Sequence, residues 1–115
     1  MKLANLKKYI EKSILSLATS KNNKPHQIAV SAVKVLGDNL IITNNFMQET
    51  KRNIASNNKV SLIFWGNKGG YELRGNAKYF SSGKWFNFVK NMGENKNFNP
   101  KGAIVVKIKQ IKKSK

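Results

Sequence analysis

The chain has 115 residues, with 22 Lys and Arg against 5 Asp and Glu, a formal net charge of +17, one His and no Cys. This length supports one domain with a sizeable core, and the absence of Cys excludes disulfides, thiolate metal sites and cysteine nucleophiles. One His and five scattered carboxylates supply little for a metal site, a catalytic triad or a carboxylate acid–base pair. The positive charge predicts attraction to anions: nucleic acid, anionic lipid or a phosphorylated cofactor.

The hydrophobic pattern of the first half predicts one amphipathic helix followed by a strand meander. Leu3, Leu6 and Ile10 share a helical face in the first dozen residues. Alternation of apolar residues then predicts three strands joined by tight turns, at residues 13–20, 26–36 and 39–44. A short helix is expected at 50–58.

The second half predicts three further strands and one helix. The strands are expected at 60–65, 71–80 and 103–111, and the helix at 83–92. Asn67, Lys68 and two glycines make the turn before the strand at 71–80. Gly75 lies inside that strand, which predicts a β-bulge or a close approach of two backbones.

These elements describe a mainly β fold, a barrel of six predominantly antiparallel strands with short flanking helices. Residues 60–65 and 103–108 are apolar on both faces, and a small barrel buries only its inner face. A second copy would cover the outer faces, so we expect a homodimer.

We expect a single domain over residues 1–115, with a basic C-terminal tail at about 109–115 that frays into solvated lysines. No apolar stretch approaches the roughly 20 residues of a membrane helix, and the N-terminal dozen lacks the apolar region of a signal peptide. A cytoplasmic location without membrane association is therefore expected.

Several strings, in this order, closely resemble the split-barrel FMN-binding proteins related to pyridoxamine 5'-phosphate oxidase, above all the small single-domain members. They are SILSLATS, KPHQIAV, LIITNN, ETKRNIASNNKVSLIFW and YELRGNAKYF. The resemblance runs from about Leu3 to Ile111. It implies a split barrel, a non-covalently bound FMN in a cleft at the dimer interface, and a role as a flavin-dependent oxidoreductase or electron carrier.

The resemblance also implies which residues contact the cofactor. The flavin ring is expected against the strand Ile28, Ala29, Val30 and Ser31. The phosphate is expected near a strand end and the next helix start, at Thr43, Asn44, Asn45, Glu49, Thr50, Lys51 and Arg52. Physical reasoning favours the helix start independently, because its free N–H groups and partial positive charge attract a phosphate, and Thr50, Lys51 and Arg52 add further donors.

Two of these positions leave alternatives open. Relatives commonly have Lys where this chain has Glu49, and a carboxylate repels a phosphate. Either Lys51 reaches back, or Glu49 points away, or FMN affinity is reduced. Arg74 either faces solvent on its strand or contacts a phosphate or flavin across the dimer interface. His26 is either a hydrogen-bonded residue at a strand start or a proton-transfer group.

The rival function is a basic barrel that binds single-stranded nucleic acid. The aromatic residues are dispersed along the chain, at Phe46, Phe64, Trp65, Tyr71, Tyr79, Phe80, Trp85, Phe86 and Phe88. This dispersal lacks the closely spaced ladder of basic and aromatic residues on adjacent strands, which favours FMN over nucleic acid as the partner. Some branches of the family bind a deazaflavin or haem, and no catalytic residue or metal site is assigned.

Overall fold

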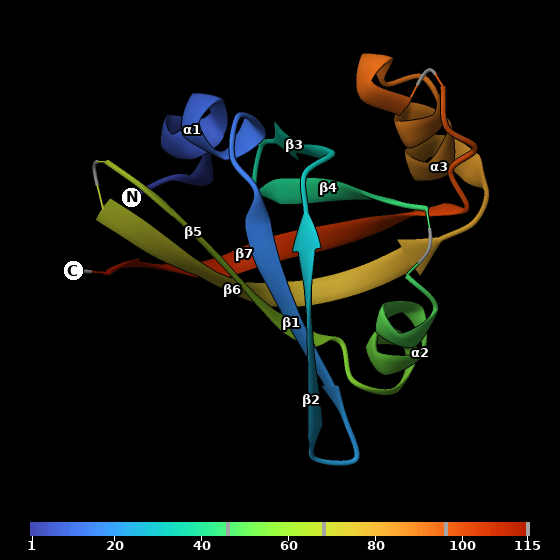
Figure 1. The fold of residues 1–115 in the computed structure, drawn as a ribbon, viewed down its shortest axis with the longest axis horizontal. Coiled ribbons are helices and arrows are strands. Elements are labelled where there is room, and N and C mark those ends of the chain that lie inside the picture. The colour runs from blue at the N-terminus through green and yellow to red at the C-terminus, as the bar shows by residue number, and fades with distance from the viewer. Residues whose placement is uncertain (46, 68, 96, 115) are drawn as a thin grey trace.

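The structure, a computed structural model, describes residues 1–45, 47–67, 69–95 and 97–114. Phe46 of the dispersed aromatic set, Lys68 of the predicted turn and Lys115 of the tail lie outside them. Seven strands form one antiparallel sheet: β1 (Leu15–Lys21), β2 (Lys24–Val30), β3 (Val33–Leu36), β4 (Asn39–Asn44), β5 (Lys59–Gly66), β6 (Gly69–Phe80) and β7 (Gly102–Ser114). The helices are the 3₁₀ turn η1 (Leu3–Leu6), α1 (Lys7–Glu11), α2 (Gln48–Ser56), α3 (Gly83–Lys90) and the 3₁₀ turn η2 (Gly93–Asn95) (Figure 1).

The sheet closes on itself through a bend that the sequence analysis missed. The strand order is β2-β1-β5-β6-β7-β4-β3, so β2 and β3 lie at opposite edges although only Ser31 and Ala32 separate them. β2 pairs with β1, and β3 pairs with β4. The predicted strand at 26–36 is therefore two strands, and the total is seven rather than six. The mainly β, antiparallel split-barrel fold class is confirmed.

The barrel interior holds the main hydrophobic core. The inward residues of the strands include Leu17, Leu62, Leu73 and Val106, all completely buried. The predicted N-terminal helix is confirmed as η1 and α1, which lie at one end of the barrel and bury Leu3, Leu6 and Ile10 (Figure 1). Burying such side chains stabilises the fold by about 2 kcal/mol each.

Gly75 allows the closest contact between β6 and β7. The register of the two strands shifts between Arg74 and Gly75, and a Cβ at Gly75 would lie 2.1 Å from the carbonyl oxygen of Lys107. The predicted bulge or close backbone approach is confirmed on both counts.

Residues 109–111 belong to β7, as the predicted strand at 103–111 requires, and the expected fraying is wrong as far as Ser114. β7 continues past the expected end at Ile111 to Ser114, because β6 begins at Gly69 and offers backbone partners as far as the Gly70–Ser114 pair.

A second hydrophobic cluster covers the outer face of β4 and β7. Ile41, Ala103 and Val105 point outward and pack under α3, where Val89 is completely buried (Figure 1). The chain itself thus covers the outer face of β7 at Ala103 and Val105, part of the face that the sequence predicts a second copy to cover, and leaves Lys107 exposed. On β5, by contrast, the side chain of Trp65 is 68% exposed. No described helix is long and apolar enough to cross a lipid bilayer.

Candidate functional site

Hydrogen bonds from α2 and from the residue before it reach two strands, β1 and β4. Within the helix, Asn53 donates from Nδ2 to Thr19 Oγ1 of β1 at 3.0 Å. At the helix start, Asn44 of β4 accepts at Oδ1 from the Met47 N–H at 2.7 Å and donates from Nδ2 to the Tyr79 hydroxyl of β6 at 2.5 Å. β1 pairs with β2, so these bonds set the first turn of α2 beside β2.

A cleft of about 530 Å³ opens between β2 and the first turn of α2. Its lining comes from two segments that lie far apart in the sequence: His26, Ile28 and Ala29 on β2, and Asn45, Met47, Gln48, Glu49 and Arg52 at the start of α2. The volume falls in the ordinary range of small-molecule sites. The cleft joins the two segments expected to hold the ring and the phosphate of a flavin.

Two buried oxygens near the helix start lack hydrogen-bond partners among the described residues, Asn45 Oδ1 and Thr50 Oγ1. Buried polar atoms are nearly always paired. Asn45 lines the cleft, where its oxygen could accept from a ligand N–H, or its amide could donate to a phosphate if turned over. Thr50 lies behind the cleft surface with its side chain fully buried.

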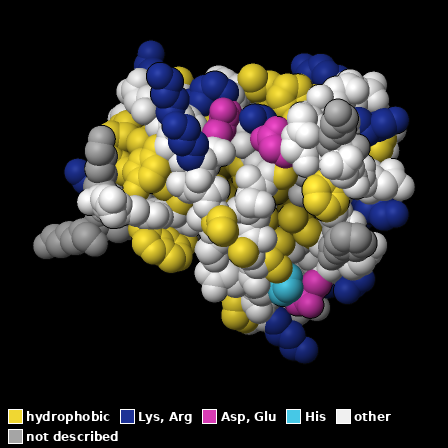
Figure 2. Space-filling model, turned by 45° about the horizontal axis from the view of Figure 1, so that its top comes forward, with side chains coloured by type: hydrophobic (Ala, Val, Ile, Leu, Met, Phe, Trp, Pro, Cys, Tyr) yellow, Lys and Arg dark blue, Asp and Glu magenta, His cyan; other side chains and the backbone are white. Residues whose placement is uncertain are grey.

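Glu49 is paired across the cleft with the only histidine. Glu49 Oε2 lies 3.2 Å from His26 Nδ1, and Figure 2 shows the histidine against an acidic side chain. The carboxylate therefore faces β2, while still lining the cleft. The structure shows His26 as a paired residue of the strand, with 23% of its side chain exposed.

Of the two cations at the helix start, Arg52 lines the cleft and Lys51 does not. Lys51 Nζ lies 4.8 Å from the centroid of the Tyr79 ring, in a cation–π contact. The two residues are adjacent in the sequence, but an α-helix turns each residue by about 100° from the last, so their side chains diverge.

The remaining predicted residues lie outside the cleft lining. Thr43 is buried and its hydroxyl accepts from Asn95 Nδ2 at 2.8 Å. Val30 is buried in the core, whereas Ser31 is exposed at the bend between β2 and β3. The contacts of Thr43 thus hold it against the η2 turn, away from the cleft.

Arg74 points from the outer face of β6, away from the cleft lining. Its Nε lies 2.8 Å from Glu72 Oε2 and its Nη2 3.3 Å from Oε1. The Arg74 hydrogen bonds, followed by one from the Ser61 hydroxyl, hold the pKa of Glu72 below its ordinary value. Within one copy, Arg74 is therefore an ion-paired residue of the sheet surface.

Three cleft residues were not among the predicted cofactor contacts: His26, weighed only as a strand-start or proton-transfer residue, Met47 and Gln48. His26 could have been found, because it lies two positions before Ile28 and side chains two apart on a strand share a face. The two others follow from where α2 begins, which is Gln48 rather than the expected residue 50.

Comparisons with known proteins agree with this fold. The family model described as pyridoxamine 5'-phosphate oxidase matches residues 4–115. An uncharacterized protein of Methanocaldococcus jannaschii is 34% identical over 111 residues, which cover 90% of this chain and 74% of that protein.

Two solved structures share the fold at low sequence identity. HupZ of Group A Streptococcus is 20% identical with a TM-score of 0.87, covering 98% of this chain and 94% of that one. An FMN-binding protein of Syntrophomonas wolfei is 20% identical with a TM-score of 0.70, covering 88% and 76%. The match of the family model over nearly the whole sequence shows that the chain belongs to the pyridoxamine 5'-phosphate oxidase family.

Proposed function

We propose that this protein binds FMN non-covalently in the cleft between β2 and α2, and acts as a flavin-dependent oxidoreductase or electron carrier. The observation that carries the proposal is the cleft itself, which brings Ile28 and Ala29 together with the start of α2. FMN supplies the redox chemistry when bound. That division of labour suits a chain with one histidine, no cysteine and five acidic residues.

The two walls of the cleft suit the two ends of the cofactor. Ile28, Ala29 and Met47 offer apolar contact to a flat ring. At the other wall, the N–H groups at the first turn of α2 have no intrahelical acceptor, and the helix dipole favours an anion there. Arg52 supplies a cation beside them and Asn45 an amide, so we assign the phosphate chiefly to these groups.

The other expected contacts are proposed in supporting roles. Thr43 and Asn44 hold the loop that carries Asn45, while Lys51 adds positive charge beside the helix start. Thr50 offers a hydroxyl without a described partner, which a phosphate reaches only if the first turn shifts. Val30 ends the strand that backs the ring, and Ser31 begins the bend after it.

We further propose that the protein is a homodimer, joined through the outer faces of β1 and β5. Ile14 and Trp65 are each 68% exposed, and the antiparallel register of these strands, with Ser16 opposite Ile63, places them side by side. Exposed apolar side chains that gather on one face mark interaction sites. In such a dimer Arg74, on the neighbouring strand β6, is placed to serve the partner's cleft.

The absorption spectrum of freshly purified protein tests the flavin proposal directly. We expect a yellow protein, or a colourless one that takes up added FMN. A hundredfold excess of FMN over its Kd should raise Tm by roughly 10 °C. Parallel titrations with a deazaflavin and with haem measure the preference for FMN. A colourless protein whose Tm does not respond to FMN would overturn the proposal.

A further inference from the structure

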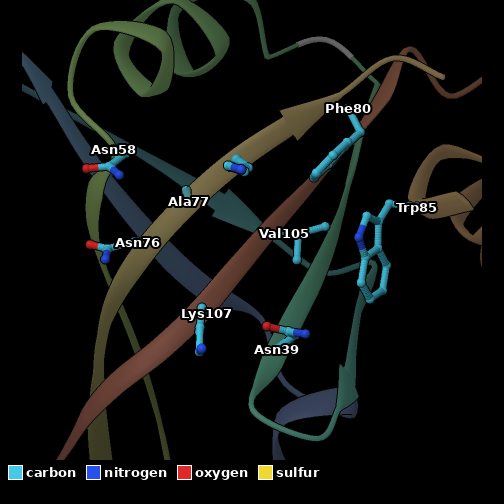
Figure 3. A pocket seen from close by; sticks show the side chains of 9 residues that line it. Asn39, Asn58, Asn76, Ala77, Phe80, Trp85, Val105 and Lys107 are labelled. Atoms are coloured by element: carbon cyan, nitrogen blue, oxygen red, sulfur yellow. The ribbon is translucent and has the colours of Figure 1, made fainter. Parts of the chain in front are cut away.

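A second hollow lies on the outer face of the sheet, beside α3. It has a volume of about 480 Å³ and shares no lining residue with the cleft between β2 and α2. Its lining combines aromatic, amide and lysine side chains: Asn39, Asn58, Asn76, Ala77, Lys78, Phe80, Trp85, Val105 and Lys107 (Figure 3). We call it the outer pocket.

The polar side of the outer pocket is a row of side chains that runs across three strands. Asn39 of β4 is opposite Lys107 of β7, and Lys107 is opposite Asn76 of β6. Neighbouring strands lie about 4.8 Å apart, so amides and ammonium groups alternate at short range. Lys78 stands two residues further along β6, opposite Val105.

The apolar end of the outer pocket is formed by two aromatic side chains. Phe80 at the end of β6 and Trp85 in the first turn of α3 both lie next to Val105 (Figure 3). Both rings are half-buried, and Val105, with 9% exposure, forms an apolar floor beside them, whereas the Ala77 side chain belongs to the barrel core on the other face of the sheet. Flat apolar walls over a dry floor suit a planar ring.

The charge of the outer pocket is positive. It is lined by Lys78 and Lys107 and by no carboxylate among the described residues. Glu72, also on the outer face of β6, is occupied by Arg74. A ligand for this site therefore combines an aromatic ring with negative charge.

We propose that the outer pocket binds a nucleotide, with its base against Phe80 and Trp85 and its phosphate on Lys78 and Lys107. Asn39, Asn58 and Asn76 supply amides for the polar edges of the base or the sugar hydroxyls. Base–aromatic stacking and lysine–phosphate contacts are the two elements of non-sequence-specific nucleotide binding. Although these residues are dispersed in the sequence, strand pairing and α3 bring them together.

The nucleotide is either a free mononucleotide or one unpaired nucleotide of a single strand, since both present the same base and phosphate. The probes are therefore AMP and a short oligo-dT, added to protein saturated with FMN so that the cleft is occupied. If the protein takes up no FMN, the same titrations are run on the free protein and on the Arg52→Gln variant, which keeps this test separate from the flavin proposal.

Fluorescence can report on the pocket because the chain has only two tryptophans. In Trp65→Phe, where Trp85 is the sole tryptophan and is excited selectively over the three tyrosines, a bound base should quench the tryptophan emission to saturation. In Trp85→Phe, the emission of Trp65 should stay constant. Saturable quenching of Trp65 and not of Trp85 would overturn the assignment of the site.

Two double variants that lose the same positive charge test the role of the pocket lysines. Lys78→Gln with Lys107→Gln should weaken binding of the better probe tenfold or more. Lys8→Gln with Lys12→Gln removes two exposed lysines near α1 and should change it less than twofold. Equal losses in the two double variants, or no quenching by either probe, would refute the proposal.

The salt dependence of binding then identifies the source of the nucleotide. Oligo-dT that binds more tightly than AMP, with an affinity that falls steeply as salt rises, indicates a single strand. AMP that binds as tightly as oligo-dT, with a shallow salt dependence, indicates a free nucleotide. Both results support a nucleotide in the outer pocket.

Discussion

Glu49 Oε2 lies 3.2 Å from His26 Nδ1, so the one acidic residue in the first turn of α2 is tied to β2 across the cleft. A carboxylate in the first turn stabilises a helix, because its negative charge lies at the positive end of the helix dipole. Glu49 also lines the cleft, beside the groups to which we assign the phosphate in our proposal. The contact with His26 turns the carboxylate toward β2.

Replacing Glu49 with Gln should therefore raise the affinity for FMN. The side chain of Glu49 is 57% exposed, so solvent screens its charge and the gain is about 0.5–1 kcal/mol, or two- to fivefold in Kd. Isothermal titration of the free protein with FMN measures it. Glu94→Gln, which removes a carboxylate paired with Lys34, is the control and should leave Kd unchanged. A weaker Kd in Glu49→Gln would show that the carboxylate assists binding.

Replacing Arg52 with Gln should weaken FMN binding more than the same change at Lys51. Arg52 lines the cleft, while Lys51 is engaged with the Tyr79 ring. A lost charge-assisted bond to phosphate costs about 2 kcal/mol, which corresponds to roughly 30-fold in Kd. Both variants lose one positive charge, so Lys51→Gln controls for the long-range electrostatic attraction between the protein and the phosphate. A larger loss in Lys51→Gln would show that Lys51 reaches back to the phosphate.

The proposed dimer depends on the exposed pair Ile14 and Trp65. Trp65→Glu would place a carboxylate in the apolar contact, and burying an unpaired charge is strongly unfavourable. We expect light scattering to show a dimer for the wild-type protein at micromolar concentration and a monomer for this variant. Phe98→Glu alters a side chain that is 60% exposed, on the loop before β7, and should remain dimeric.

Two outcomes would count against this interface. A monomeric wild-type protein removes the dimer altogether. If Trp65→Glu stays dimeric while Phe98→Glu dissociates, the dimer interface includes Phe98 and not Trp65.

Local patterns were enough to predict most of the elements, but not how distant elements meet. The alternation in β1, β5 and β6 is a local property, and each was found at nearly its observed bounds. The bend at Ser31 and Ala32 is not local, because neither residue is a Gly or Pro and the bend exists only to join the two edges of the sheet. The end of β7 was missed for a similar reason, since it depends on where β6 begins.

The same distinction holds for the candidate site. Charge and helix position indicated the residues at the start of α2, yet only the packing of α2 on β1 decides that Arg52, and not Lys51, lines the cleft. The pairing of Glu49 with His26 joins residues 23 positions apart, and no local pattern predicts it. Likewise, the outer apolar face of β7 indicated a missing cover, but periodicity could not show that α3 supplies it.

Replacing Gly75 with Ala should destabilise the barrel strongly. The new Cβ would meet the carbonyl oxygen of Lys107 at 2.1 Å and its carbonyl carbon at 2.9 Å, and neither is a flexible side-chain atom that can move aside. Forcing β6 and β7 apart should cost about 3 kcal/mol, which lowers Tm by roughly 12 °C in a domain of this size. Gly93→Ala is the matched control, since a Cβ there meets nothing within 4 Å. Thermal unfolding followed by circular dichroism compares the two variants. Equal Tm values would show that β6 and β7 can move apart at the bulge without lowering the free energy of unfolding.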